Sequence, residues 1–405
     1  MKNFKRPYII ILLGALTALG PFSIDMYLPG FASIASDLHS PIAHVSLSLT
    51  SYFIGISIGQ LIYGPLLDRY GRKKPLITGL VIYITAALLC GAASSVVMLI
   101  FLRLMLALGA CVCLVASRAV VSDLFPHKEM AKIFSSLVLI MSISPILAPS
   151  VGGIVTTYLG WRYIFFTLAL IAMLMLLAVI KILPESKGSD KSISLKLNSI
   201  LTGYFDVISE PNFLIFTVAG GIASAGMFAY IAGAPFVFME LFGLNEGIFG
   251  IIFSINACGF ILGSQINRLL LRKYNDYNIA FFVSYSQGGV AVLLFISLCL
   301  GLLNAVTLTV FAFLFLFLLG FISPNVTAIA LEPFYRNAGR ASALLGGIQM
   351  VLGASATGLV NTFADGTAKP MIAVMLGSAI ICIALISYYE YNTKNKDIVS
   401  NTIIR

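Results

Sequence analysis

The sequence predicts an all-α polytopic membrane protein, with twelve transmembrane helices arranged as two six-helix bundles. The chain has 405 residues, of which 59% are hydrophobic, and its mean hydropathy is +1.00. A soluble domain cannot bury that much apolar surface, so the surrounding solvent must be lipid. The apolar stretches are long and uniform rather than short and alternating, which excludes a transmembrane β-barrel.

Apolar runs of about 20 residues, the length that crosses a bilayer as a helix, recur along the chain. The predicted spans are residues 8–30, 45–66, 75–95, 98–121, 133–157, 163–183, 213–238, 247–267, 279–302, 306–331, 341–363 and 370–390. The basic and apolar start of the chain would also fit a secretory signal. The run continues past signal-peptide length and carries Asp25, however, so we predict a retained first span.

The net charge of +9 is explained by topology better than by nucleic-acid binding. If both termini lie inside, 21 of the 25 Lys and Arg residues fall on the cytoplasmic side. Arg162 and Lys369 fall in outer loops, while Arg103 and Arg118 lie within the fourth span. This asymmetry is the positive-inside pattern, and it predicts cytoplasmic termini and no nucleic-acid partner.

The longest polar interruption, from Pro184 to Asn212, separates six predicted spans from six. We therefore predict an N-terminal bundle, a cytoplasmic linker, a C-terminal bundle and a cytoplasmic tail, at residues 1–186, 187–209, 210–392 and 393–405. Apolar linker side chains recur at helical spacing, at Leu197, Leu201, Tyr204 and Ile208. This pattern fits either an amphipathic helix on the inner membrane surface or a solvated loop.

A charged turn, GPLLDRYGRKKP, follows the second span and has an echo of the same spacing in the second half. Three positions of the turn recur, as Gly64, Asp68 and Arg69 in the first half and Gly263, Asn267 and Arg268 in the second. Six spans return the chain to its starting side. The halves are therefore predicted to be parallel repeats with a binding site between them.

The pattern G-x-x-x-D-R-x-G-R-K over residues 64–73 resembles the signature loop of the major facilitator superfamily. Three further stretches, IDMYLPGFASIASDL, ASRAVVSDLF and SPILAPSVGG, resemble the bicyclomycin-resistance branch of drug:proton antiporters. The resemblance covers essentially the whole chain. It implies the major facilitator fold and proton-driven export of drug-like small molecules, of multidrug or bicyclomycin/chloramphenicol type, by alternating access.

The same resemblance implies a bacterial inner membrane, and we expect a monomer. We expect no metal and no cofactor, because the sequence has no phosphate-binding loop and its three histidines are split between the two faces. The alternative is a proton-coupled transporter, including an importer, of a metabolite such as a nucleoside or an amino-acid derivative.

The loop between the second and third spans is predicted to be a conformational latch. Gly64 would allow close helix approach and Gly71 a tight turn, while Asp68 would accept hydrogen bonds from arginines or helix N-terminal amides. The predicted latch residues are Gly64, Asp68, Arg69, Gly71, Arg72, Arg118 and Asp123. For Arg118 we expect an ion pair with Asp123 rather than a substrate contact. The alternative for the loop charges is simple anchoring at the lipid headgroups.

Asp25 is the only acidic residue predicted to lie well inside a span. An intramembrane charge costs about 2.5–3.5 kcal/mol even on insertion scales, so it indicates function. Burial favours the protonated carboxyl, whereas Arg103, predicted at a matching depth, would favour the charged form. We predict that Asp25 exchanges the coupling proton and pairs with Arg103, as the resemblance also implies; a structural ion pair is the alternative. Leu106 departs from the family, which often has Gln there.

The fifth predicted span holds prolines and glycines that resemble the antiporter motif of exporters, namely Pro145, Ala148, Pro149, Gly152 and Gly153. A proline removes a helix hydrogen bond, and glycines allow another helix to pack closely. Such a helix suits exchange, although both residue types are common in membrane helices. The predicted substrate-contact residues are Asp25, Leu49, Tyr52, Ala110, Tyr230 and Asn256.

Overall fold

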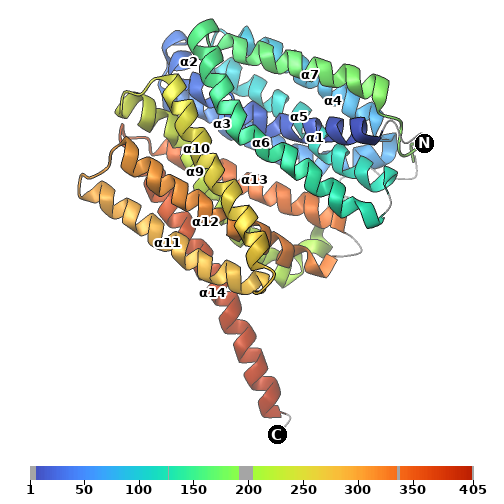
Figure 1. The fold of residues 1–405 in the computed structure, drawn as a ribbon, viewed down its shortest axis with the longest axis vertical. Coiled ribbons are helices and arrows are strands. Elements are labelled where there is room, and N and C mark those ends of the chain that lie inside the picture. Colours follow the sequence, from blue (N-terminus) through green and yellow to red (C-terminus); the bar gives the residue numbers. More distant parts are fainter. Residues whose placement is uncertain (1–5, 126, 191–203, 335–337, 404–405) are drawn as a thin grey trace.

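The computed structural model describes residues 6–125, 127–190, 204–334 and 338–403. Twelve helical segments in these ranges are long and apolar enough to cross a membrane, as the sequence predicts (Figure 1). The first half contains α1 (Arg6–Asp25), α2 (Phe31–Asp37), α3 (Ile42–Tyr70), α4 (Lys73–Gly91), α5 (Val96–Leu124), α6 (His127–Leu159) and α7 (Arg162–Ile182). The second half contains α9 (Pro211–Pro235), α10 (Glu246–Leu270), α11 (Asp276–Cys299), α12 (Ala305–Leu331), α13 (Ala338–Thr362) and α14 (Lys369–Ile403).

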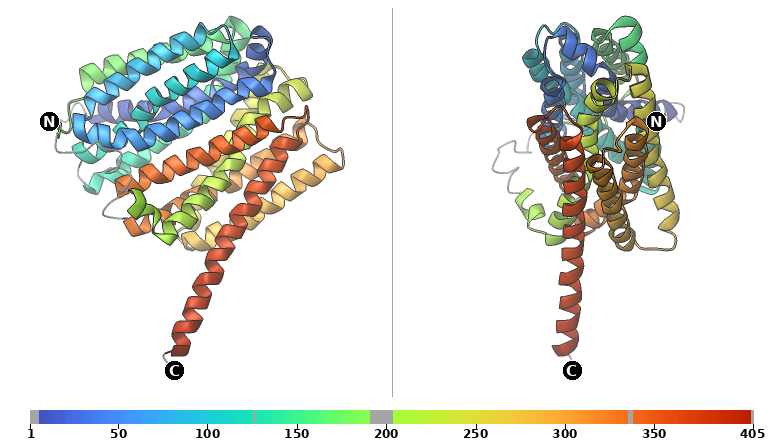
Figure 2. Two further views of the ribbon diagram at one scale, coloured as in Figure 1. Left: turned by 180° about the vertical axis from the view of Figure 1, so that it is seen from behind. Right: turned by 90° about the vertical axis from the view of Figure 1, so that its left-hand side faces the viewer.

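The two halves lie beside each other as separate groups of helices (Figure 2). One end of the bundle carries the turn between α3 and α4 with Arg72 and Lys73, and we call it the basic side. The opposite end, which carries the connections α2–α3 and α13–α14, is called the far side. Predicted linker residues 191–203 lie outside the described residues, while residues 204–208 form a short helix.

The first span is broken, where the sequence predicted one continuous helix. The α-helix ends at Asp25, and a 3₁₀ turn over Leu28–Gly30 leads into α2. Pro29 has no N–H, so it cannot donate the hydrogen bond that a continuing helix would give to the carbonyl of Asp25. Asp25 therefore lies at a helix end inside the protein rather than in the middle of a regular helix.

Hydrogen bonds join the halves at several helix pairs, including α3 with α13 and α6 with α10, where the Ser150 and Ser254 hydroxyls pair at 3.1 Å. Thr50 and Thr357 pair through their hydroxyls at 2.8 Å, and Ser57 donates to the carbonyl of Gly347 at 3.0 Å. Beside the far-side end of α6, the α2 hydroxyl of Ser33 donates to Glu246 at 2.9 Å. The far-side ends of the two halves are thus in direct contact.

Candidate functional site

Arg103 on α5 lies fully buried between two aromatic rings. Its guanidinium carbon is 4.4 Å from the ring centre of Tyr27 and 4.5 Å from that of Tyr52. Nη1 donates to the backbone carbonyl of Ser23 at 2.9 Å, while Nε and Nη2 have no partner in the described structure. The rings and the carbonyl stabilise a desolvated cation and leave two of its donor nitrogens unused.

Hydrogen bonds fix both rings around Arg103. The Tyr52 hydroxyl donates to the carbonyl of Gly20 at 3.1 Å, and the Tyr27 hydroxyl pairs with Ser48 at 3.0 Å. The two bonds link α3 to α1 and to the turn that follows it. Tyr52, predicted to contact substrate, is therefore held against Arg103. Tyr27 was missed, although it follows Asp25 by two residues in the conspicuous IDMYLP stretch.

The structure does not form the predicted Asp25–Arg103 ion pair. Asp25 is only 6% exposed, and its carboxylate has no hydrogen bond or ion pair with any described residue. Residues two apart on a helix point to different faces. Because the Ser23 hydroxyl faces α4, where it pairs with Tyr83 at 2.6 Å, Asp25 points elsewhere. The two ionisable groups are both buried, as predicted, but they are not joined.

The other predicted substrate contacts divide between the two halves. Leu49 and Ala110 pack in the buried interior of the first half. In the second half, Asn256 Nδ2 donates to the Tyr230 hydroxyl at 2.7 Å, so these two predicted residues do meet. The Tyr230 ring stacks on the Phe253 ring, with 5.7 Å between the ring centres. The Asn256 side-chain oxygen has no partner in the ranges described.

On the basic side, Arg72 is the centre of the predicted latch. Its Nε donates to Asp123 at 2.8 Å and its Nη1 to Asp68 at 3.0 Å. Burial alone would lower the pKa of Arg72, but its bonds to Asp123 and Asp68 hold that pKa above its ordinary value. Arg69, which the sequence also assigned to the latch, has its guanidinium carbon 5.8 Å from the Tyr70 ring centre.

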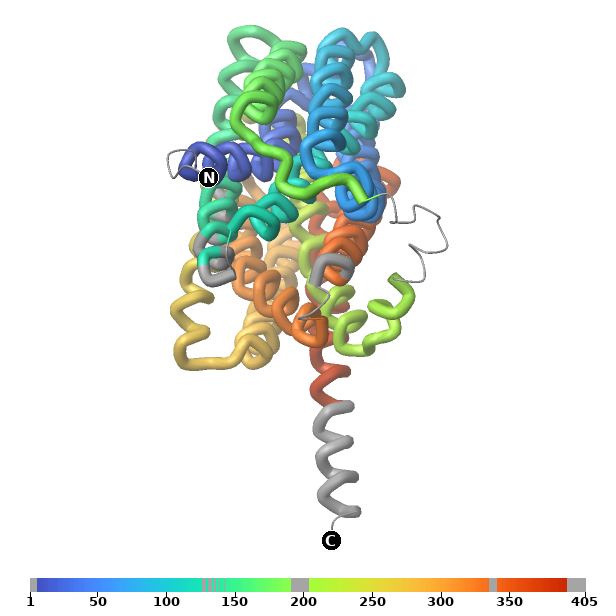
Figure 3. Tube along the Cα trace, turned by 90° about the vertical axis from the view of Figure 1, so that its right-hand side faces the viewer, coloured from blue at the N-terminus to red at the C-terminus, as the bar shows by residue number. Residues whose placement is uncertain are grey.

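The segment after α7 completes this cluster, and the sequence did not reveal it. Figure 3 shows the light-green chain running across to the blue turn between α3 and α4. Lys187 Nζ lies 2.9 Å from Asp68, and the Ser186 hydroxyl donates to Asp123 at 2.8 Å. The available signal was the group of polar and charged residues, PESK, directly after the sixth span.

Glu185 caps the start of α4. Its carboxylate accepts the backbone N–H of Arg72 at 2.7 Å and that of Lys73 at 3.2 Å. An anion at a helix N-terminus satisfies free amides and complements the helix dipole. The expected capping of a neighbouring helix by an acid is therefore present, but Glu185 provides it instead of Asp68.

The two glycines of the loop behave differently. Gly71 has a φ of +82°, so it forms the predicted tight turn that other residues would strain to adopt. The prediction of close helix approach at Gly64 is wrong for this structure, because a methyl group there would meet no atom within 4 Å. Its counterpart Gly263 does allow close approach, since a methyl group would collide with the carbonyl of Phe317 on α12.

Arg118 does not form the predicted ion pair with Asp123. The two residues are five apart on α5, about 140° around the helix, so they face different directions. Asp123 is bonded to Arg72 and Ser186, whereas the Arg118 side chain is exposed and has no ion pair with any residue in the described ranges. Arg118 is thus outside the latch as the structure forms it.

The proline–glycine motif of α6 lies between two neighbours. A methyl group at Gly152 would collide with the backbone of Met26, at the break after α1. A methyl group at Gly153 would come within 2.9 Å of the carbonyl of Glu246 on α10. The two adjacent glycines therefore allow α6 to pack closely against two segments. Gly152 lies against the chain that follows Asp25, and Gly153 lies against the start of α10 in the other half.

In the second half, an amide pair replaces the charged cluster. Asn267 Nδ2 donates to Asn325 Oδ1 at 3.2 Å, and Asn325 Nδ2 donates back to Asn267 Oδ1 at 2.8 Å. Both side chains are buried. The neutral pair bonds α10 to α12 without any charge to neutralise.

Twelve spans in two halves, with a buried ionisable site and contacts between the halves, define a secondary membrane transporter. The chain belongs to the Major Facilitator Superfamily, whose pattern it matches over residues 13–358. It is 34% identical to "Uncharacterized MFS-type transporter YdgK" of Bacillus subtilis, over 93% of this chain and 94% of the relative. It is 30% identical to a "Bicyclomycin resistance protein homolog" of Haemophilus influenzae, over 98% of this chain and 99% of the relative.

Solved structures share the fold at low sequence identity. A bacterial homolog of the human lysosomal transporter Spinster, in an inward-facing and occupied conformation, has a TM-score of 0.74 at 12% identity, covering 97% of this chain and 98% of that one. The nucleoside transporter NupG has a TM-score of 0.72 at 14% identity, and the match covers 95% of this chain and 99% of that one. Identities this low support the fold and nothing finer.

Proposed function

We propose that this transporter exports drug-like small molecules from bacteria in exchange for protons. The support from relatives is their names, which include the Haemophilus bicyclomycin resistance homolog and "Multidrug resistance protein D" of Escherichia coli, 27% identical over 87% of this chain and 88% of the relative. A "Chloramphenicol resistance protein" of Pseudomonas aeruginosa is 27% identical over 95% of this chain and 92% of the relative. Chloramphenicol is therefore a sensible first compound to test.

The observation that carries the proposal is the pair of buried, incompletely satisfied groups in the first half. Asp25 has no described partner, and Arg103 has two unused donor nitrogens. An unpaired carboxylate is costly to bury, so this arrangement suits Asp25 in its protonated form. Release of the proton would leave a charge that the unused Arg103 donors are able to stabilise after a local shift.

In this proposal the break between α1 and α2 is where the shift occurs. Asp25 ends α1, and the Ser23 carbonyl that binds Arg103 lies half a turn before it. A small rotation of this segment would replace the Ser23 carbonyl by the Asp25 carboxylate as the acceptor for Arg103. Gly152 permits close contact between α6 and the break, so the rotation is transmitted to the helix that touches α10. Proton release is thereby linked to the contact between halves.

We also propose that the basic side faces the cytoplasm of a bacterial inner membrane and that the protein works as a monomer. The distribution of Lys and Arg supports this orientation. With the far-side contact of Ser33 and Glu246 formed, the structure then represents an arrangement closed toward the outside. Export requires that contact to break. In this proposal the Arg72 cluster meanwhile holds the basic-side ends of the first-half helices together.

The test is transport of chloramphenicol in inverted vesicles with an imposed proton gradient. We expect accumulation by the wild-type protein and none by Asp25→Asn. Asp206→Asn is the matched control, because Asp206 is exposed on the short helix before α9. Gradient-driven accumulation by Asp25→Asn at the wild-type rate would overturn the coupling role. A wild-type protein inactive toward a broad drug panel, but active with a nucleoside or amino-acid derivative, would overturn drug export.

A further inference from the structure

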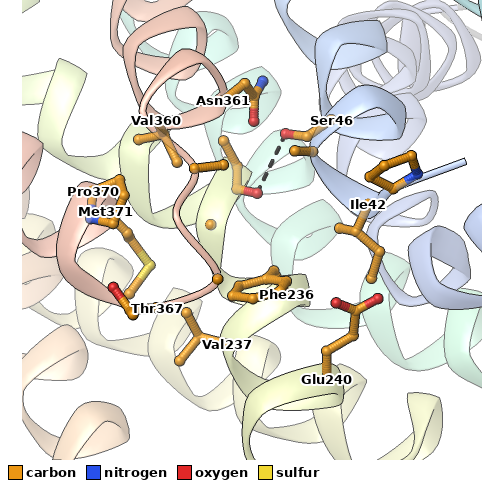
Figure 4. A pocket seen from close by; sticks show the side chains of 16 residues that line it. Ile42, Ser46, Phe236, Val237, Glu240, Val360, Asn361, Thr367, Pro370 and Met371 are labelled. Carbon is orange, nitrogen blue, oxygen red and sulfur yellow. Dashed lines mark hydrogen bonds between the residues drawn. The ribbon is translucent and has the colours of Figure 1, made fainter.

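A cavity of about 270 Å³ opens at the far-side end between the two halves (Figure 4). Its walls come from the start of α3, the turn after α9, the end of α13 and the start of α14. They include Ile42, Ser46, Phe236, Glu240, Asn361 and Met371. Because α3 belongs to one half and the other elements to the second, the cavity has this shape only while the far-side ends are together.

Two polar groups of the cavity have no partner in the described structure. Glu240 is the only charged residue of the wall, and its exposed carboxylate makes no hydrogen bond or ion pair with any described residue. Asn361 Nδ2 is buried and equally unpartnered. The Ser46 hydroxyl, by contrast, is already bonded to the carbonyl of Ala232 at 3.3 Å. The cavity therefore offers one anionic acceptor and one amide donor on apolar walls.

The segment that carries Glu240 is irregular. Residues Phe236–Leu241 form a π-helical turn after Pro235, closed by a bond from the N–H of Phe242 to the carbonyl of Val237 at 3.0 Å. Turns of this kind are rare and occur frequently at functional sites. Here the turn places Phe236, Val237 and Glu240 on the same wall (Figure 4).

The adjoining loop adds negative charge. Thr367, which also lines the cavity, donates its hydroxyl to Asp365 at 2.6 Å, and this bond holds the pKa of Asp365 below its usual value. Asp365 is therefore ionised at neutral pH, close to the cavity mouth. Lys369 begins α14 directly after this loop, but it makes no ion pair with Glu240 in the residues described.

We propose that this cavity is a second ligand site, for a lipophilic organic cation. The Glu240 carboxylate binds the cationic group, the Phe236 ring and the Met371 side chain contact its apolar body, and Asn361 donates to an acceptor on the ligand. Neither Arg103 nor Asp25 lines this cavity, and the proposal stands or falls independently of proton coupling and drug export.

Binding of a fluorescent lipophilic monocation, 4-(4-dimethylaminostyryl)-N-methylpyridinium, to the full chain in lipid nanodiscs tests the proposal. We expect Glu240→Gln to weaken binding about tenfold, because it removes the only charged partner of the cation. Glu332→Gln is the matched control, since Glu332 is an exposed glutamate on the basic side, and its affinity should equal that of wild type. Equal affinities of Glu240→Gln and wild type would overturn the proposal.

A second pair of variants separates this site from any central one. Ala364 lines the cavity and is exposed, so Ala364→Trp should obstruct the cavity and weaken binding without changing any charge. Asp206→Asn, which removes an exposed carboxylate outside the cavity wall, should leave the affinity unchanged. Loss of binding in Asp25→Asn with retention in both cavity variants would place the cation elsewhere and overturn the proposal.

Discussion

Arg103 donates a hydrogen bond to the carbonyl of Ser23 at 2.9 Å, two residues before the carboxylate that a buried arginine would be expected to bind. The acceptor is neutral, so it does not compensate the positive charge of Arg103. The guanidinium lies against two tyrosine rings, and two of its donor nitrogens have no partner in the described structure. A buried arginine without a carboxylate is costly, and in this structure only the two rings and the Ser23 carbonyl offset that cost. The arrangement is what a site would show while its carboxyl group carries a proton.

The ring of Tyr52, rather than its hydroxyl, should matter for Arg103. A cation–π contact with a desolvated arginine is worth about 2 kcal/mol, so Tyr52→Leu should lower transport about tenfold or more. Tyr52→Phe keeps the ring and loses only the bond to Gly20, so it should remain within about threefold of wild type. Initial transport rates in proteoliposomes measure both. Equal losses in the two variants would show that the hydroxyl is the important group.

Arg72 should stabilise the basic side far more than the adjacent exposed lysine does. Arg72→Gln leaves the partly buried Asp123 without its ion-pair partner, and we expect a loss of about 1–3 kcal/mol in the free energy of unfolding. Lys74→Gln removes the same charge at an exposed position and should change that free energy by less than about 0.5 kcal/mol. Unfolding titrations with SDS provide the measurement. Similar values for the two variants would contradict a specific role of the cluster.

The equivalent glycines of the two halves should respond oppositely to alanine. Gly64→Ala adds a methyl group in open space within a helix and should stabilise the protein by about 0.5–1 kcal/mol. Gly263→Ala drives a methyl group into the backbone of α12 and should cost about 1–3 kcal/mol. Melting temperatures of the purified variants check the sign of each change. A destabilised Gly64→Ala would mean that another helix approaches there during the cycle.

Asn267 and Asn325 should be energetically coupled. Replacing either one by Leu leaves the other amide buried and unpaired, at a cost of about 1–3 kcal/mol. The double replacement removes both polar groups, so its cost should be smaller than the sum of the single costs by about 1 kcal/mol or more. A double-mutant cycle of unfolding free energies measures the coupling. Additive costs would mean that the two amides act separately.

The spans, the Gly71 turn and the burial of Asp25 and Arg103 were all predictable, because hydropathy and loop composition are local properties of the chain. The partners of Arg103 were not predictable, since they depend on how α1 is rotated. That rotation decides whether Ser23 or Asp25 faces α5. The pairing of Lys187 with Asp68 also escaped prediction, because it joins segments that only the folded bundle brings together. Sequence spacing alone likewise suggested Arg118 for Asp123, although helix geometry separates them.

The central claim is that Asp25 carries the proton that the cargo displaces. Proton release on chloramphenicol addition, followed with a pH indicator and purified protein in weakly buffered detergent, tests it most directly. We predict about one proton released per bound molecule for the wild-type protein and for Asp206→Asn, and none for Asp25→Asn, which has no carboxyl proton to lose. Undiminished proton release by an Asp25→Asn protein that still binds the compound would contradict the claim.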